Sequence, residues 1–337
     1  MPSGRLSERI VIAGASSLLG NEVKSLLEES RFAGWDLRLV DEEDVAGTLT
    51  EAGGEAAFIQ RIEEDTFHGA KYAFLTGSEA FAKRSLSPAR EAGSVIIDFS
   101  RATLSDPDAV PWFPKIEALT GRTVAKNART FTVFSVGGTA VTSLSLGLRP
   151  LGLKRLAVVI NRPVSESGRE GIEELETQTS QLLSFQSIGQ QVFGTQAAFN
   201  LLPCFGAESR QDLRGNLFEI RAEISAALAD AEEDAKVAVK LVHAPVFYGT
   251  TFSACADLET NAESEAVVSA CRAAGFSMLP CAEAAPSNVS VAGETSIFLQ
   301  GPESDPVVPG CWWFWGAGDN LRVPAWNGCK LAEWLEG

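Results

Sequence analysis

Glycines and hydroxyl groups in the stretch RIVIAGASSLLG, residues 9–20, have the spacing in this sequence that best suits a chemical task. Gly14 and Gly20 lie six residues apart with Ser17 between them, and an apolar run precedes them. A glycine loop between a strand and a helix binds a pyrophosphate, because its N–H groups and the positive end of the helix dipole face the anion. The stretch therefore predicts the first βα unit of a dinucleotide-binding domain. A βα turn that binds no nucleotide stays open as the alternative.

An acidic run, Asp41 to Asp44, follows the predicted second strand, DLRLV at 36–40. An acid after this strand accepts the ribose hydroxyls of NAD, whereas the extra phosphate of NADP would meet like charge with no arginine expected opposite it. The run therefore favours NAD over NADP as cofactor. A solvated acidic turn, with no dinucleotide bound at all, is the other interpretation.

The small number of histidines limits the metal sites and hydrolase active sites that this chain can form. The only histidines are His68 and His243, and the six cysteines include no C-x-x-C pair. A histidine-based metal site or a Ser-His-Asp arrangement is thus nearly excluded, and no metal site is predicted. The cysteines are expected to be free and mostly buried, with Cys255 read as a core thiol.

Bulk composition is that of a globular protein. The chain has 337 residues, enough for two domains, with 45% hydrophobic and 21% charged residues. A net charge of −16 argues against nucleic acid or an anionic membrane as partner, since both need a basic face. No apolar run approaches the ~20 residues of a membrane span, and the N-terminal residues lack an apolar signal core. We therefore expect a cytoplasmic protein and a loose tail over residues 1–8.

The elements that must position these residues alternate strand and helix in the first part of the chain. KYAFL at 71–75 and SVIID at 94–98 flank a helix at 79–92, a rhythm that predicts parallel strands with right-handed crossovers. A further strand at 130–136 precedes a turn at Gly137 and Gly138 and then a helix at 139–148.

Later segments predict a second domain. Strands are expected at 156–161, 237–243, 251–258, 289–299 and 311–316, with helices between them that need not make the strands parallel. The fold class is therefore α/β: an N-terminal Rossmann-like, doubly wound parallel sheet, and an α+β dimerisation domain with a mixed sheet. We expect residues 1–136 plus 318–337 to form the NAD(P)-binding domain and residues 137–317 the substrate and dimerisation domain.

Seven segments in order, from about Arg9 to Glu336, resemble the aspartate-semialdehyde dehydrogenase family. They are GASSLLG at 14–20, FLTGS at 74–78, AGSVIIDFS at 92–100, SESGREGIEELETQT at 165–179, FNLLP at 199–203, APVFYG at 244–249 and WFWGAGDNLRVPAWN at 313–327. The family reduces an acyl phosphate to an aldehyde with NADPH. A cysteine attacks the carbonyl, a histidine manages the proton, and an arginine grips the substrate carboxylate.

This chain departs from that pattern at the residues that carry the reaction. The resemblance puts Thr139 at the place of the nucleophilic cysteine and Thr250 at the place of the histidine. His243 stands where the family has its arginine, and Arg162 where it has a glutamine that positions the acyl group. The usg-type paralogues of the family also lack the cysteine.

Cofactor contacts are also implied by the resemblance and by the glycine loop. They are expected in loops at Gly14, Ser16, Ser17, Leu18, Leu19, Asp41, Thr76, Gly77, Ser100 and Asn320. The side chain of Ser17 stands where the backbone should approach the phosphate closely, although its hydroxyl can itself bind phosphate.

Three hypotheses about function follow. The first is a homologue that keeps the fold, has lost the dehydrogenase reaction, and binds a ligand, a dinucleotide or a partner. The alternative is an NAD(P)-dependent oxidoreductase acting on an aldehyde or oxo group in amino-acid biosynthesis. The third is a structural partner of an active paralogue. A homodimer through the second domain is expected, because its strands carry apolar side chains at both odd and even positions.

Overall fold

A computed structural model describes residues 8–52, 54–229, 235–259, 262–280 and 284–337. The predicted tail at 1–8 lies almost wholly outside the described residues. The chain divides into two compact units. The first unit comprises Met1–Pro114, Thr123–Phe134 and Pro324–Gly337, and the second comprises Lys115–Arg122 and Ser135–Val323.

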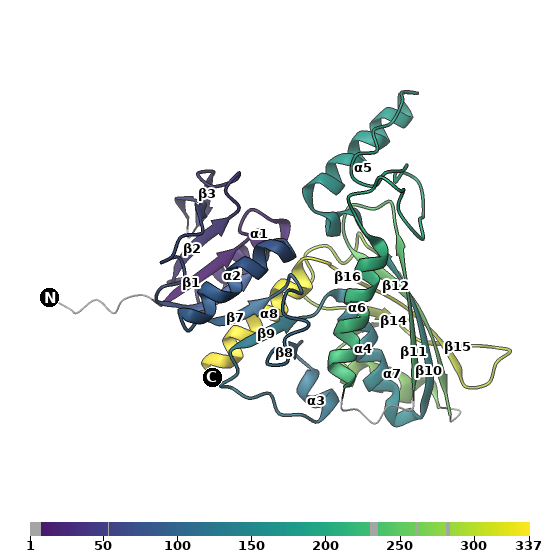
Figure 1. Cartoon of the computed structure of the whole chain (residues 1–337). Coiled ribbons are helices and arrows are strands. Elements are labelled where there is room, and N and C mark those ends of the chain that lie inside the picture. Colours follow the sequence, from purple (N-terminus) through teal and green to yellow (C-terminus); the bar gives the residue numbers. More distant parts are fainter. Residues whose placement is uncertain (1–7, 53, 230–234, 260–261, 281–283) are drawn as a thin grey trace. The chain divides into compact units, whose positions relative to one another are not determined.

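The first unit is built on a parallel sheet of seven strands (Figure 1). In sheet order these are β5 (Gln60–Arg61), β2 (Asp36–Asp41), β1 (Arg9–Ala13), β6 (Ala70–Leu75), β7 (Val95–Asp98), β9 (Thr130–Val133) and β8 (Val110–Trp112). Every pairing between them is parallel. From β1 the order runs to β2 and β5 on one side and to β6 and β7 on the other, where β9 then precedes the edge strand β8. The predicted Rossmann-like sheet is confirmed.

Three helices and a hairpin complete this unit. The helices are α1 (Leu18–Glu28), α2 (Glu79–Glu91) and α8 (Arg322–Glu336), of which α8 belongs to the unit from Pro324 onward. The hairpin pairs β3 (Leu49–Ala52) with β4 (Glu55–Phe58). Pro88 lies inside α2 without ending it. Each helix follows or faces a strand with a buried apolar stripe, as the sequence pattern predicts.

The second unit carries a mixed sheet, as expected. Its order is β11 (Lys236–His243), β10 (Leu153–Arg162), β12 (Thr250–Leu258), β16 (Cys311–Gly318), β14 (Phe298–Gln300) and β13 (Ser277–Leu279), with β15 (Glu303–Ser304) also paired to β16. Strands β10 and β11 are parallel, whereas β12 is antiparallel to both β10 and β16.

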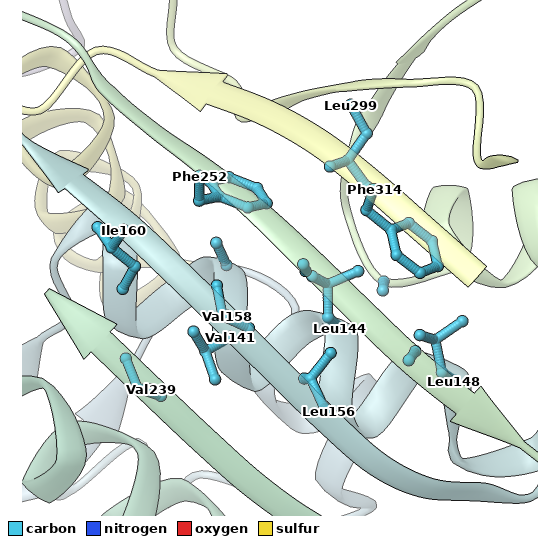
Figure 2. Packing of buried hydrophobic residues seen from close by; sticks show 14 of the residues in the cluster. Val141, Leu144, Leu148, Leu156, Val158, Ile160, Val239, Phe252, Leu299 and Phe314 are labelled. Carbon is cyan, nitrogen blue, oxygen red and sulfur yellow. The ribbon is translucent and has the colours of Figure 1, made fainter. Parts of the chain in front are cut away.

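One face of this sheet is covered by α4 (Val136–Leu148), α6 (Leu213–Leu228) and α7 (Ser264–Ala273), which share a single core with it. Leu156, Val158 and Ile160 are every second residue of β10, and their side chains all face these helices. Figure 2 shows them in one cluster with Leu144 of α4. Burying each such side chain contributes about 1.5–3 kcal/mol to stability. The residues between them point to the opposite face, because strand side chains alternate.

In the described chain, four more helical elements belong to the second unit. They are α3 (Ile116–Thr120), α5 (Gly168–Leu183), and the 3-10 turns η1 (Arg149–Leu151) and η2 (Val164–Ser167). Among the described helices, none has both the length and the apolar character to cross a bilayer.

Two local predictions are wrong. Gly137 and Gly138 lie inside α4 rather than in a turn before it, because Ser135 caps the helix by accepting the Gly138 N–H at 3.0 Å. Of the strand predicted at 289–299, only Phe298 and Leu299 pair in the sheet, as part of β14, because a turn closed by Ser287 and Ser290 occupies its first part. Alternating apolar residues there had no sheet partner to pair with.

Candidate functional site

The glycine loop of the first unit packs directly on the loop that follows β6. Gly14 has φ +95°, and a Cβ on it would lie 2.1 Å from the backbone nitrogen of Gly77. The Thr76 hydroxyl donates to the Gly14 carbonyl at 3.0 Å, and the Ser17 hydroxyl donates to the Thr76 carbonyl at 2.9 Å. The structure therefore brings together four of the predicted cofactor residues, from two loops.

The N-terminus of α1 keeps donors for an anion. Ser17 caps the helix by accepting the Gly20 N–H at 2.8 Å. The backbone N–H groups of Leu18 and Leu19 donate no hydrogen bond to another residue of the described chain. These are the unpaired donors that every helix N-terminus presents, and they suit a phosphate.

Asp41 lies beside this loop but is largely occupied by the backbone. Its carboxylate accepts the Ser16 N–H at 2.7 Å and the Glu42 N–H at 2.8 Å, and the residue is buried. Each carboxylate oxygen has a second lone pair, so a ribose hydroxyl would share Asp41 with these amides. Asp41 thus also fixes the glycine loop, a role that the sequence analysis missed.

A hollow of about 700 Å³ adjoins Asp41. It is lined by Asp41, Glu42, Glu43, Arg61, Ile62, Glu63, Glu64, Phe81 and Arg84. The expectation that no arginine stands near the acidic run is wrong. Arg84 is ion-paired with Glu42, and Arg61 with Glu63 at 3.0 Å. Five acids and two arginines still leave the lining acidic.

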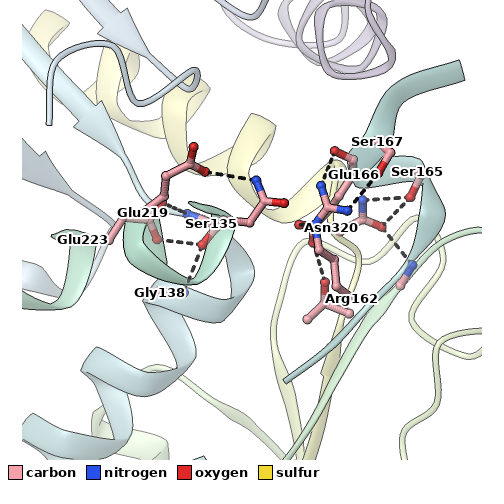
Figure 3. Close-up of polar contacts among 12 residues, drawn as sticks. Ser135, Gly138, Arg162, Ser165, Glu166, Ser167, Glu219, Glu223 and Asn320 are labelled. Carbon is pink, nitrogen blue, oxygen red and sulfur yellow. Dashed lines mark hydrogen bonds and ion pairs between the residues drawn. The ribbon is translucent and has the colours of Figure 1, made fainter. Parts of the chain in front are cut away.

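Two further predicted residues lie in different units. Ser100, in the first unit, donates from its hydroxyl to Asp98 at 2.6 Å. Asn320, in the second unit, accepts the Gly249 N–H at 2.8 Å and donates to the Ser165 hydroxyl at 3.0 Å. Asn320 therefore holds two loops of its own unit together (Figure 3).

Thr139 lies in the first turn of α4 and is buried. Its hydroxyl oxygen makes no hydrogen bond within the part of the chain that the structure describes. A threonine hydroxyl attacks a carbonyl only with an adjacent base that takes its proton. The described residues supply no such base at Thr139.

A carboxylate occupies the N-terminus of the same helix. Glu223 of α6 is fully buried and accepts the Ser135 hydroxyl at 2.6 Å and the Ser135 N–H at 3.2 Å (Figure 3). A Cβ on Gly138 would lie 1.8 Å from its Oε2, so only glycine fits under it. The carboxyl group of Glu223 therefore lies at the positive end of the α4 dipole.

Arg162 and Thr250 meet at one acid, Glu166 of η2. The Arg162 Nε lies 3.1 Å from the Glu166 carboxylate, and the Thr250 hydroxyl donates to that carboxylate at 2.9 Å. Arg162 also donates to the Ser167 hydroxyl and to the Glu166 carbonyl. Its side chain is only 4% exposed, so its positive charge is paired with Glu166 inside the protein and does not face solvent. Figure 3 shows this cluster at the end of β10.

His243 ends β11 in an aromatic setting. It is fully buried, with the rings of Phe193 and Phe205 centred 5.2 and 5.3 Å from its own. Burial, helped by the charge of Arg162 and opposed by the Ala197 backbone, lowers the pKa of His243 to about 4. The imidazole is thus uncharged at neutral pH and cannot hold a substrate carboxylate as an arginine would.

The loop that carries Phe193 is fastened from α5. Glu174 accepts the N–H groups of Val192 and Phe193, and Gln178 accepts those of Ala197 and Ala198. Both acceptors are buried. Their contacts fix the ring of Phe193 against His243.

Sequence reasoning missed two residues that organise this unit. Glu166 lies four residues after Arg162, but Arg162 ends a strand, so the helical i,i+4 rule gave no signal for the ion pair. Glu223 lies 88 residues after Ser135, and nothing local marks it. The second unit thus gathers Arg162, Thr250 and Glu166 into one polar cluster. It places Thr139 in a separate buried position, where no described residue accepts a hydrogen bond from its hydroxyl.

The family model described as "Semialdehyde dehydrogenase, dimerisation domain" matches residues 146–323. The chain is 29% identical over 333 residues to the USG-1 protein homolog of Azotobacter vinelandii, covering 97% of each chain. It is 26% identical over 341 residues to the aspartate-semialdehyde dehydrogenase of Aquifex aeolicus, again covering 97% of each. Its fold matches aspartate semialdehyde dehydrogenase II of Vibrio cholerae, solved as a complex with ASA, with a TM-score of 0.84, 22% identity and 99% of each chain covered.

Proposed function

Because the chain belongs to the family defined by the semialdehyde dehydrogenase dimerisation domain, we propose that it is a member without the dehydrogenase reaction. In this proposal the protein acts by binding, through a dinucleotide site in the first unit and a dimer face in the second. The observation that carries it is the Thr139 hydroxyl, buried and without a hydrogen bond to a described residue at the nucleophile's place in the sequence. Covalent acyl transfer needs an activated nucleophile, and Thr139 has no activating base.

The contacts of Glu223 support the same conclusion. A helix N-terminus stabilises a developing negative charge when its donors are free to face it. Glu223 already places a carboxylate against Ser135 at the start of α4. The Ser135 N–H and hydroxyl are thus occupied and are not free to face a developing charge.

Substrate recognition is also weakened. Arg162 is paired with Glu166, and His243 is neutral, so neither presents an unshared positive charge to a carboxylate. Removing several members of a covalent-catalysis unit costs the rate almost completely, since the members act together.

Dinucleotide binding is supported by the first unit, where Leu18 and Leu19 keep free amides at the N-terminus of α1. The acidic lining beside Asp41 favours NAD over NADP. These features also support the alternative function, an NAD(P)-dependent oxidoreductase acting on an aldehyde or oxo group, because hydride transfer to such a carbonyl needs no covalent step.

A homodimer through the second unit is the third part of the proposal. The sheet face away from α4, α6 and α7 exposes 42% of Val159 and 46% of Trp313. Large exposed apolar residues on a sheet face mark an interface, and a two-fold self-contact is the commonest way to cover one.

Two measurements on the purified full chain test this function. Phosphate-dependent NADP reduction with aspartate semialdehyde should be undetectable, and nicotinamide fluorescence should report NADH binding. Turnover at a rate ordinary for enzymes would overturn the proposal. Binding of NADH followed by its oxidation on adding an aldehyde or ketone would establish the oxidoreductase alternative instead.

A further inference from the structure

Two cysteines that lie 56 residues apart come together on the sheet of the second unit. The sulfur atoms of Cys255, on β12, and Cys311, at the start of β16, are 3.2 Å apart. Asp257 is directly opposite Cys311 in the antiparallel register. One ligand atom from each of the three residues lies within 4.8 Å of the other two.

These side chains point away from the helix-covered core. Ala254, Ala256 and Trp312 belong to the core, and strand neighbours alternate between faces. Cys255 is partly exposed and the Asp257 side chain is 31% exposed, whereas Cys311 is buried. Cys255 is directly opposite Trp313, so the cluster lies on the sheet face that we propose as the dimer contact. The expectation that Cys255 is a core thiol is therefore wrong.

We propose that Cys255, Asp257 and Cys311 bind a thiophilic divalent cation, for which Zn²⁺ is the best match. Thiolate and carboxylate are zinc ligands, with Zn–S near 2.3 Å and Zn–O about 2.0–2.2 Å. Two sulfurs bound tetrahedrally at that length lie about 3.8 Å apart, so the pair needs to open only slightly from its separation here. The three side chains leave the fourth position of the tetrahedron open.

The strand register disfavours a disulfide between the same cysteines. Cys255 faces Trp313 and Cys311 faces Asp257, so the cysteines are diagonal neighbours. Diagonal Cα atoms in an antiparallel pair lie about 7–8 Å apart, beyond the roughly 4.4–6.8 Å of disulfides. A metal ion can link the two diagonal cysteines without moving the strands, because two metal–sulfur bonds span a longer distance than one sulfur–sulfur bond.

Arg155 provides a built-in competitor for the carboxylate. Its Nε lies 2.7 Å from the Asp257 carboxylate, on the neighbouring strand β10. A bound cation competes with this ion pair, because the Asp257 carboxylate oxygen that coordinates the metal is no longer fully available to Arg155. Removing Arg155 should therefore strengthen metal binding, whereas neutralising Asp257 should weaken it.

The experiment uses the full chain, reduced and stripped of metal, titrated with Zn²⁺ against a chromophoric chelator and separately with Cd²⁺. We expect one ion per chain at this site and a thiolate-to-cadmium charge-transfer band. Cys255→Ser and Cys311→Ser should each weaken binding by roughly a hundredfold or more, and Asp257→Asn by about tenfold. Arg155→Gln should tighten binding several-fold. Cys204→Ser, at an exposed cysteine elsewhere in the unit, is the matched control and should change nothing.

Zinc binding that survives both serine variants, or a cadmium complex without the charge-transfer band, would refute the site. The site would also be refuted if peptide mass spectrometry after exposure to air finds a disulfide between Cys255 and Cys311 even when Zn²⁺ is present. Circular dichroism of each variant checks folding, and the opposite signs expected for Asp257→Asn and Arg155→Gln separate metal binding from a loss of structure.

Discussion

The Thr250 hydroxyl donates a 2.9 Å hydrogen bond to the carboxylate of Glu166, 84 residues earlier in the chain. The same carboxylate lies 3.1 Å from the Nε of Arg162. The sequence resemblance puts Thr250 and Arg162 at the places of the family's histidine and glutamine, and Glu166 joins the two side chains into one cluster. We therefore expect substitution of this acid to change the stability of the fold.

Glu166→Gln should lower the free energy of unfolding by about 3 kcal/mol. The substitution leaves the buried guanidinium of Arg162 without its counter-charge, which is costly in the protein interior. Thr250→Val is the comparison variant and should cost about 1 kcal/mol, the value of one hydrogen bond. Urea unfolding of both variants measures the difference, and equal losses would contradict the central role of Glu166.

Thr139→Cys alone should not create semialdehyde dehydrogenase activity. The new thiol would lie at the nucleophile's place, but Thr250 cannot act as a base and Glu223 holds the start of α4. The assay is phosphate-dependent NADP reduction, with thiol labelling to measure the reactivity of the new cysteine. Activity in the single variant would show that the rest of the site is intact.

Protein stability should fall as the pH is lowered from 7 to 5. The pKa of His243 is about 4 in the folded chain and ordinarily about 6.5, so the unfolded chain binds the extra proton across this window. The contribution of His243 is complete above pH 6.5 and should shrink by about 2 kcal/mol between pH 7 and 5.

His243→Phe should remove that part of the pH dependence, measured by urea unfolding at both pH values. His68→Gln is the matched control, because His68 is the other histidine of the chain and is exposed. If the free energy of unfolding of His243→Phe still falls by the same amount between pH 7 and 5, then His243 is not held neutral in the folded chain.

NAD should bind more tightly than NADP, by calorimetry on the full chain. Glu42→Gln should reduce the ratio of NAD to NADP affinity several-fold. The substitution releases Arg84 from its ion pair beside Asp41, so that the guanidinium can pair with the extra phosphate of NADP. Adding Arg84→Gln to that variant should cancel the gain for NADP. Tighter NADP binding by the unmodified chain would refute the assignment of the acidic run to the ribose.

Light scattering should give a mass near twice 35.9 kDa at micromolar concentration. Trp313→Lys should shift the mass toward the monomer, because it places a charge on the exposed sheet face. Phe218→Lys, at an exposed position on α6, should leave the mass unchanged. A mass near 36 kDa for the unmodified chain would exclude the dimer.

The sequence by itself determined the order of elements and the parallel sheet of the first unit. Residues 9–29 encode β1, its loop and α1 through an apolar run, a capping serine and a helical repeat, all of which act over a few residues. Such local signals predict a strand or helix wherever the neighbouring chain agrees. At 289–299 the same alternation failed, because a strand also needs a partner that the sequence does not display.

Tertiary structure alone decided the contacts that define the candidate sites. Glu223 reaches Ser135 from 88 residues away, and Cys311 reaches Cys255 from 56 residues away. The cysteine pairing depends on the register of β12 against β16, which two strands fix only by packing against a common core. Long-range pairings of this kind leave no periodic trace in either segment, so composition and spacing could not reveal them.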